Sequence, residues 1–151
     1  MSTETRVYNG DEVSIIFGPV IITGFADGEF LRVEQETDDF DSVAGTDGEV
    51  AVSKTNDRRG TVTIMLLQTT LANQLLSDLR NAGLTVPNSL VAFNPLLIRD
   101  NTGTTLYTEE SAYIGKAPDA SFDRTAQPRE WMIKCPHLVR VDGTNNLAGL
   151  I

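Results

Sequence analysis

The feature that most constrains the fold is a long polar segment placed between two segments of alternating apolar and polar residues. Residues 29–36 and 61–66 alternate with the period of a half-buried β-strand. Between them, residues 37–52 are polar and acidic. A loop of this length inside a compact β framework is typically functional or disordered. Because the segment holds no catalytic group, we expect it to contact another copy of the protein.

One segment has helical rather than strand periodicity. Apolar residues recur at helical spacing from Leu71 to Ala82. Thr69 or Thr70 can cap the start, and Gly83 can end the helix in a left-handed cap. We expect one amphipathic helix of about 14 residues, an ordinary length. Its apolar stripe is expected to cover the open side of a sheet, and a binding site for a partner is the alternative.

Many short strands with one helix predict a mainly β protein. The expected architecture is a β-sandwich or barrel with one flanking α-helix and a long loop between early strands. We expect a single domain over residues 1–151, with a polar N-terminal arm at residues 1–11. Extended segments are expected at residues 13–17, 20–23, 29–36, 49–54, 61–68, 91–100, 104–107, 111–114, 129–134 and 138–141.

Composition excludes several classes of protein. The net charge of -9 argues against a general nucleic-acid-binding face, because an acidic surface repels phosphate. The single cysteine allows no internal disulfide, which fits folding in a reducing compartment. The N-terminus lacks the apolar region of a signal peptide, and no run approaches the ~20 apolar residues of a membrane-spanning helix. We therefore expect a protein made in the cytosol and soluble there, without a membrane anchor.

No residue pattern predicts an enzyme. Cys135 and His137 are two positions apart, which on a strand is roughly 7 Å and too far for a direct hydrogen bond. Pro136 between them also disfavours a regular strand, so we expect a core cysteine beside a surface histidine. Arg58 and Arg59 are expected to form local salt bridges rather than a nucleic-acid patch.

Cofactor and metal sites also lack their usual signatures. The acidic residues of 37–52 do not have EF-hand spacing, so a solvated loop is favoured and a partial ion site is the alternative. No phosphate-binding glycine motif is present. Paired carboxylates for glycoside cleavage stay open, although one Trp and three Tyr make a thin platform for sugar. We expect no enzyme activity, no cofactor and no metal.

Four stretches, in one order along the chain, carry a family resemblance. They are residues 22–30 followed by 33–34, residues 45–50 with 53–57, residues 95–103 and residues 129–135. Together they resemble tail tube proteins of contractile-tailed bacteriophages, over most of the chain. The resemblance implies a sandwich or barrel with a flanking helix, assembled as hexameric rings that stack into a hollow tube.

The resemblance also implies partners and a location. The expected partners are further copies of the chain, the tail sheath protein, the tape-measure protein, and the baseplate or tube initiator and tail terminator proteins. DNA would pass through the lumen without specific binding. The protein would be assembled in the host cytoplasm and reside in the tail tube of the virion. A bacteriocin tube, a secretion-system tube, a small enzyme with an acidic cleft and a monomeric binding module are the alternatives.

The long loop supplies the candidates for contact between subunits. In related tubes such a loop reaches a neighbouring subunit or ring, and residues 37–52 match it. Phe40 stands alone among aspartates, and we expect it to enter a pocket on the next subunit as an apolar anchor. The alternative is that it folds back on its own domain. The other candidates in the loop are Asp38, Asp39, Asp41 and Asp47.

A second set of acidic residues is expected to face the lumen. Glu34, Glu36 and Glu49 lie on polar strand faces beside the long loop. An acidic lumen would repel DNA phosphates and let DNA slide without sticking. The sequence thus predicts two kinds of functional surface, one for assembly and one for the passage of DNA.

Overall fold

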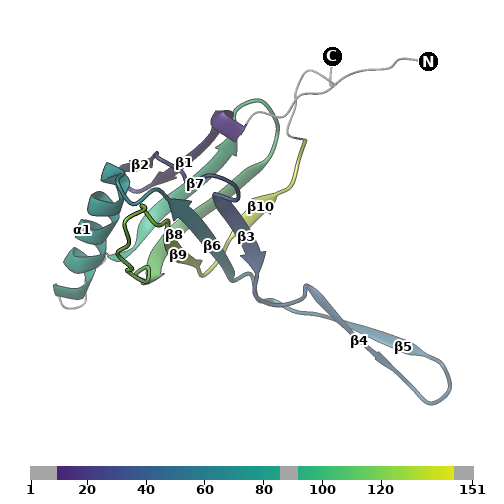
Figure 1. Cartoon of the computed structure of the whole chain (residues 1–151). Coiled ribbons are helices and arrows are strands. Elements are labelled where there is room, and N and C mark those ends of the chain that lie inside the picture. Colours follow the sequence, from purple (N-terminus) through teal and green to yellow (C-terminus); the bar gives the residue numbers. More distant parts are fainter. Residues whose placement is uncertain (1–9, 86–91, 145–151) are drawn as a thin grey trace, which may run out of the picture.

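The structure, a computed structural model, describes residues 10–85 and 92–144 (Figure 1). The predicted N-terminal arm lies mostly outside these residues, and its last part forms a short 3-10 helix. The expectation of a mainly β protein with one flanking helix is confirmed. The elements are η1 (Gly10–Glu12), β1 (Val13–Phe17), β2 (Val20–Ile22), β3 (Leu31–Gln35), β4 (Phe40–Ala44), β5 (Val50–Lys54), β6 (Gly60–Leu66), α1 (Leu71–Thr85), β7 (Asn94–Asp100), β8 (Leu106–Lys116), β9 (Arg129–Cys135) and β10 (Val139–Val141).

Eight strands form one antiparallel sheet. Their order is β2-β1-β7-β8-β9-β6-β3, and β10 also pairs with β8. The long strand β8 joins the two halves, because its first part pairs with β7 and β10 and its last part pairs with β9. Register shifts interrupt both the β7–β8 and the β8–β9 ladders. Such bulges bend a sheet and increase its twist, and here the two halves share one core.

Strand alternation places the apolar side chains of both halves in this core. In β6, Val62, Ile64 and Leu66 are fully buried, as their period-2 spacing predicts. Burying each such side chain contributes about 1.5–3 kcal/mol. The other buried strand residues are Ile15, Phe17, Val20, Ile22, Leu96, Ile98, Ala112, Trp131, Ile133 and Cys135.

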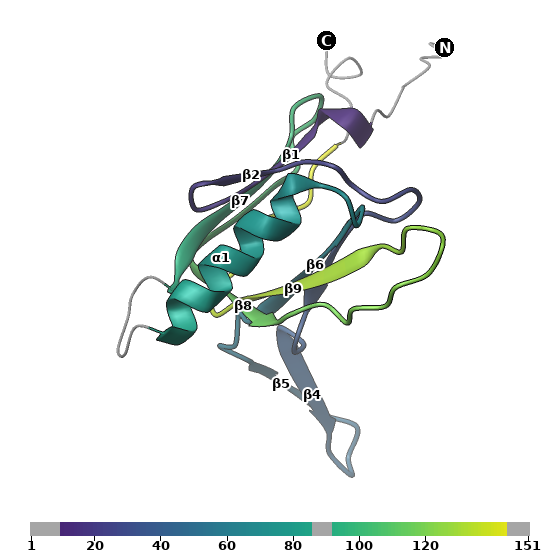
Figure 2. The same ribbon diagram turned by 60° about the vertical axis from the view of Figure 1, so that its left-hand side comes forward.

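Helix α1 covers the open side of the curved sheet (Figure 2). Ala72 and Leu76 are buried, and Leu79 packs against the core. On the outer side of the helix, Leu71 and Leu84 are 69% and 68% exposed. The prediction that the apolar stripe covers the sheet is therefore confirmed for the inner half of the stripe.

Polar contacts attach α1 to both halves of the sheet. The indole N–H of Trp131, on β9, donates to Asn73 Oδ1 at 2.9 Å. The hydroxyl of Thr70 donates to the carbonyl of Thr23, just after β2, at 3.0 Å. Gly24 has φ +78 and lies so close to Thr70 that a Cβ would clash with its hydroxyl. The close contact between Gly24 and the residue before α1 therefore requires glycine at position 24.

The predicted left-handed cap at Gly83 is wrong. Helix α1 continues to Thr85, and Gly83 is not among the positive-φ glycines of the described chain. A Cβ on Gly83 would lie 2.8 Å from the Cβ of Ala92. The glycine is therefore needed for close packing against the returning chain rather than for ending the helix.

The two short strands predicted at residues 104–107 and 111–114 are one strand, β8. Glu109 interrupts the apolar alternation in sequence, yet it is buried within the strand. Its carboxylate accepts hydrogen bonds from the backbone N–H groups of Ser111 (3.1 Å) and His137 (2.7 Å). A buried carboxylate with backbone donors is compatible with a strand interior, which a simple hydropathy pattern does not reveal.

The segment predicted as a long loop is an antiparallel β-hairpin. The strand predicted at residues 49–54 is confirmed as β5, and its partner β4 was not predicted. All residues of both strands are exposed. Hydrophobic alternation appears only where one face of a strand is buried, so an exposed strand leaves no such signal.

Leu76 should dominate the attachment of α1 to the sheet. We expect Leu76→Ala to lower the free energy of unfolding by about 2–5 kcal/mol, because it leaves a cavity in the core. Urea denaturation followed by Trp131 fluorescence measures this loss. The matched control is Leu84→Ala on the exposed side of the same helix, which should change stability by less than about 0.5 kcal/mol. Equal losses from the two variants would contradict this packing.

Candidate assembly interface

The β4–β5 hairpin projects from the domain as an arm (Figure 1). Cross-strand pairing places Phe40, Val50 and Val52 on one face and Val43 on the other. These four side chains are 61–68% exposed. An isolated two-stranded hairpin is marginally stable in water, and clustered exposed apolar groups mark interaction sites. The arm therefore presents a surface suited to a partner.

Hydrogen bonds fix the direction of the arm at its root. The amide nitrogen of Gln35, at the end of β3, donates to the carbonyl of Thr37 at 2.6 Å and to Asp39 Oδ1 at 2.8 Å. The backbone N–H of Thr55 donates to the carbonyl of Asp39 at 2.8 Å. These bonds tie both strands of the hairpin to the main sheet.

The acidic loop candidates are spread along the arm rather than gathered. Asp38 and Asp39 lie at the root, Asp41 lies on β4, and Asp47 lies in the turn at the tip. Asp41 accepts a hydrogen bond from the N–H of Ser42 at 2.9 Å. Throughout the described residues, no three His, Cys, Asp or Glu side chains are placed to hold a metal ion.

Phe40 lies outside the core of its own domain. Its ring helps to line a hollow of about 560 Å³ at the root of the arm. The rest of this hollow is mostly polar, with Lys54, Arg58 and Arg59 among its lining residues. Arg59 forms the expected local salt bridge, with Asp57 at 2.8 Å. Phe40 is thus available to a second molecule.

The outward face of β3, β6 and β9 carries two of the three lumen candidates. Glu34 lies 3.5 Å from Arg32. Glu36 lies 3.6 Å from the amine of Lys134. The hydroxyl of Thr61 donates to Glu36 and, together with Lys134, lowers the pKa of this carboxyl. The face is therefore polar and ion-paired rather than uniformly acidic.

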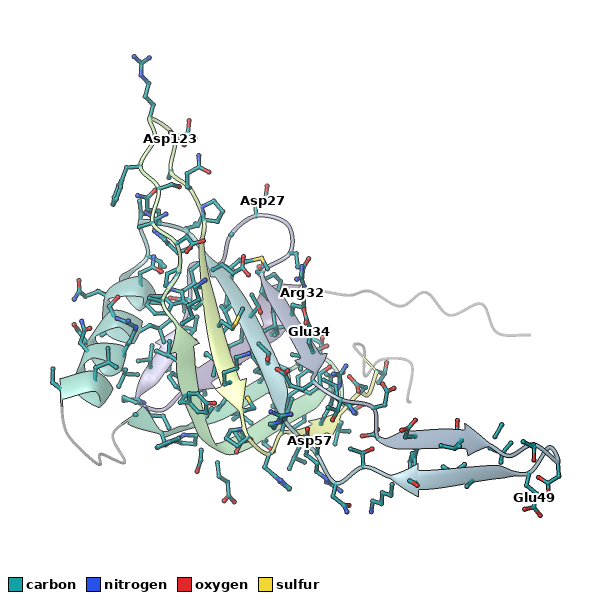
Figure 3. The ribbon with its side chains drawn as sticks, turned by 90° about the horizontal axis from the view of Figure 1, so that it is seen from below. Asp27, Arg32, Glu34, Glu49, Asp57 and Asp123 are labelled. Atoms are coloured by element: carbon teal, nitrogen blue, oxygen red, sulfur yellow. The ribbon has the colours of Figure 1, made fainter. Side chains whose placement is uncertain are left out.

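Glu49 is separated from this face. Figure 3 shows it at the tip of the arm, whereas Glu34 lies on the main sheet. Sequence proximity to the long loop grouped the three glutamates, but the hairpin carries Glu49 away from the other two. Glu34 and Glu36 therefore share one surface, and Glu49 lies on a different one.

Cys135 and His137 form no catalytic pair. The cysteine is buried, and its desolvation, with a smaller effect of Glu109, raises the pKa of the thiol to about 12. A thiol with a raised pKa is a poor nucleophile at neutral pH. His137 is exposed. The prediction of a core cysteine beside a surface histidine is confirmed.

A family model described as the bacteriophage PhiTE tail tube protein matches residues 18–143, which include the arm and every strand of the main sheet except β1. The chain belongs to this tail tube family. It is also similar to the structural protein ORF10 of Pseudomonas phage KPP10, at 26% identity over 96% of this chain and 87% of that protein. The family is one of structural phage proteins, as the sequence resemblance predicted.

Solved structures support the fold of this tail tube family member. The tube-terminating cap of the anti-feeding prophage covers 93% of the chain and 95% of its own length, with a TM-score of 0.57 and 8% identity. The sheath/tube terminator of an extracellular contractile injection system, PVC, covers 93% of the chain and 100% of its own length. Its TM-score is 0.60, at 14% identity. In the part of the chain that the structure describes, no helix has the length and apolar character to span a membrane.

Sequence reasoning missed an arginine-lined hollow in this tail tube family member. Arg129 begins β9 on the same face as the buried residues Trp131, Ile133 and Cys135, and it is 8% exposed. It helps to line a hollow of about 380 Å³ beside α1. An arginine in register with core residues of a predicted strand is a signal that could have found this site.

Proposed function

We propose that the chain is a structural subunit of a phage tail tube, assembled as hexameric rings that stack into a hollow tube for the passage of DNA. The observation that carries the proposal is the family match over residues 18–143. The projecting arm supports it, because the arm has an exposed apolar surface and little reason to be stable without a partner.

The sheet offers further surfaces for assembly. Strands β2 and β3 are at the ends of the strand order, so within residues 10–85 and 92–144 each has one edge without a neighbour in the main sheet. Free strand edges are templates for pairing with another chain. Contacts between different patches on identical subunits generate rings when they close and open stacks when they do not.

The outward face of β3, β6 and β9 is the surface that we assign to the lumen. It presents Glu34 and Glu36 with their partners Arg32 and Lys134. Side chains in ion pairs on the protein are poorly placed to capture DNA phosphates, and the net charge of -9 repels them. This combination favours DNA sliding through the tube without specific binding.

The proposal includes partners and a location. A tail tube subunit contacts the sheath outside, the tape-measure protein inside before DNA passes, and initiator and terminator proteins at the two ends. We place the protein in the virion tail, after assembly in the host cytoplasm. The inner tube of a bacteriocin or secretion system would use the same subunit surfaces.

A second candidate is a tube terminator that caps one end of the tail. Both solved structures described above are terminators of contractile systems. The two functions differ in where the protein lies. Antibody-gold labelling of intact virions would mark the whole tail for a tube subunit and one tail end for a terminator.

Negative-stain electron microscopy of the concentrated protein tests the proposal. We expect rings with a central hole or hollow tubes, because every copy carries an arm and exposed strand edges. If small particles alone are seen, the protein is offered to tail assembly reactions that contain the initiator complex. Failure to enter tails in these reactions would overturn the proposal.

Phe40 is expected to anchor the arm in a neighbouring subunit. Phe40→Ala should prevent assembly while the monomer stays folded, because a buried aromatic anchor often supplies more than about 2 kcal/mol of binding free energy. Pelleting and microscopy measure assembly, and circular dichroism checks the fold. The control is Val43→Ala on the opposite face of the arm, which should assemble nearly normally. Normal tubes from Phe40→Ala would contradict the role of Phe40 as an anchor.

Charge reversal on the lumen face should slow DNA ejection. We expect virions carrying Glu34→Lys and Glu36→Lys to assemble tails normally but to eject DNA more slowly, because added cations bind phosphates. Ejection is followed by the fluorescence of a DNA-binding dye, at several salt concentrations. The matched control is Glu110→Lys, an exposed acidic position on β8. Ejection at the wild-type rate would contradict the assignment of this face to the lumen.

A further inference from the structure

The hollow beside α1 lies between the helix, the loop of residues 117–128 and the start of β9. Arg80 and Asn81 line it from the helix, Phe122 from the loop, and Arg129 and Trp131 from β9. No acidic side chain is among its lining residues. Asp119 and Asp123 belong to the same loop but do not line the hollow. The site therefore concentrates positive charge in a protein of net charge -9.

Arg129 is buried without a full set of partners. Its Nη2 donates to the carbonyl of Ser121 at 3.2 Å, and its guanidinium lies 5.4 Å from the centre of the Phe122 ring. Its Nη1 is buried and has no hydrogen-bond partner among the described residues. An arginine held in this way is costly unless an anion pairs with it. The preferred partner of a guanidinium fork is a carboxylate or a phosphate.

Arg80 adds a second cation at the mouth of the hollow. It is half-buried on α1, and none of the ion pairs among the described residues involves it. Phe122 is 82% exposed at the same site. A ligand for this hollow should therefore combine a carboxylate with an adjacent apolar group, which would cover the Phe122 ring.

The tip of the arm has this chemistry. Glu49 is an exposed carboxylate, and the next residue, Val50, is an exposed apolar side chain on β5. The neighbouring Asp47 is turned toward its own turn, where it accepts the N–H of Glu49 at 3.4 Å. We infer that the arginine-lined hollow binds the tip of the β4–β5 arm of a second copy, with Glu49 as the carboxylate that pairs with Arg80 and Arg129.

The positions of the two surfaces agree with this inference. Figure 3 shows Glu49 at the end of the arm and the loop that carries Asp123 on the opposite side of the molecule. A contact between the tip of one copy and the hollow of another joins two different surfaces, so it can repeat from copy to copy. The inference rests on the proposed function and adds the receiving surface for the arm.

A charge-swap experiment tests the pairing in the full-length protein. Glu49→Arg and Arg80→Glu are expected each to raise the concentration needed for assembly by about tenfold or more, because each places like charges together. A mixture of the two variants should recover assembly, since each tip then meets an opposite charge. Arg124→Glu and Glu110→Arg make the same charge changes at exposed positions outside the hollow and should assemble as the wild type does.

Disulfide trapping provides a test that does not depend on spontaneous assembly. One protein carries Val50→Cys, which keeps the Glu49 carboxylate, and the other carries Phe122→Cys, while the native Cys135 is buried and does not compete. A crosslinked heterodimer is expected after mild oxidation, and Asp27→Cys in place of Phe122→Cys should give none. Circular dichroism is used to check that all variants are folded.

The outcomes separate this inference from the proposed function. If the wild type forms tubes but both single charge variants assemble equally well, the hollow is not the receptor and the tube function stands. Failure of the mixture to recover, or absence of the Val50–Phe122 crosslink, would also overturn the inference. Only failure of the wild type to form rings or to enter tails bears on the tube function itself.

Discussion

The core shared by helix α1 and the two halves of the sheet is the constraint on which the rest of the structure depends. Trp131 is buried in the shared core, and its indole N–H reaches Asn73 on the helix. The same side chain, together with Asn73, helps to line the arginine hollow. Trp131 therefore connects the core, the helix and the hollow. A change there would alter folding and assembly together.

The arm, unlike the core, contributes little to the stability of the subunit. Its strands are exposed on both faces and are joined to the domain only at the root, by bonds such as those from Gln35. Residues of the arm therefore add little to the stability of an isolated subunit, because exposed substitutions usually change it by less than about 0.5 kcal/mol. Substitutions on the arm can therefore change the contact between subunits that we propose without unfolding the subunit.

The main elements could be predicted because burial leaves a periodic record in the sequence. Strand β6 directs its alternate apolar residues into the core and helix α1 buries one face, and the apolar spacing of both elements reveals this. Strand β4 leaves no such record, since neither of its faces is buried within the subunit. Arg129 was overlooked for the opposite reason, because a charged residue is not expected at a core-facing position. Both failures fall on surfaces that we propose to meet a second copy of the chain.

The distribution of charge connects these surfaces. On the outward face of the sheet, Arg32 lies between Glu29 (2.6 Å) and Glu34 (3.5 Å), and Lys134 lies beside Glu36. In contrast, Glu49 on the arm and Arg129 in the hollow have no salt-bridge partner among the described residues. The arm tip and the hollow are of opposite sign, and Figure 3 shows Glu49 at the tip, far from the loop that carries Asp123. A contact between two different surfaces can repeat from copy to copy. Complementary charge at the tip and in the hollow therefore supports the repeating assembly that we propose.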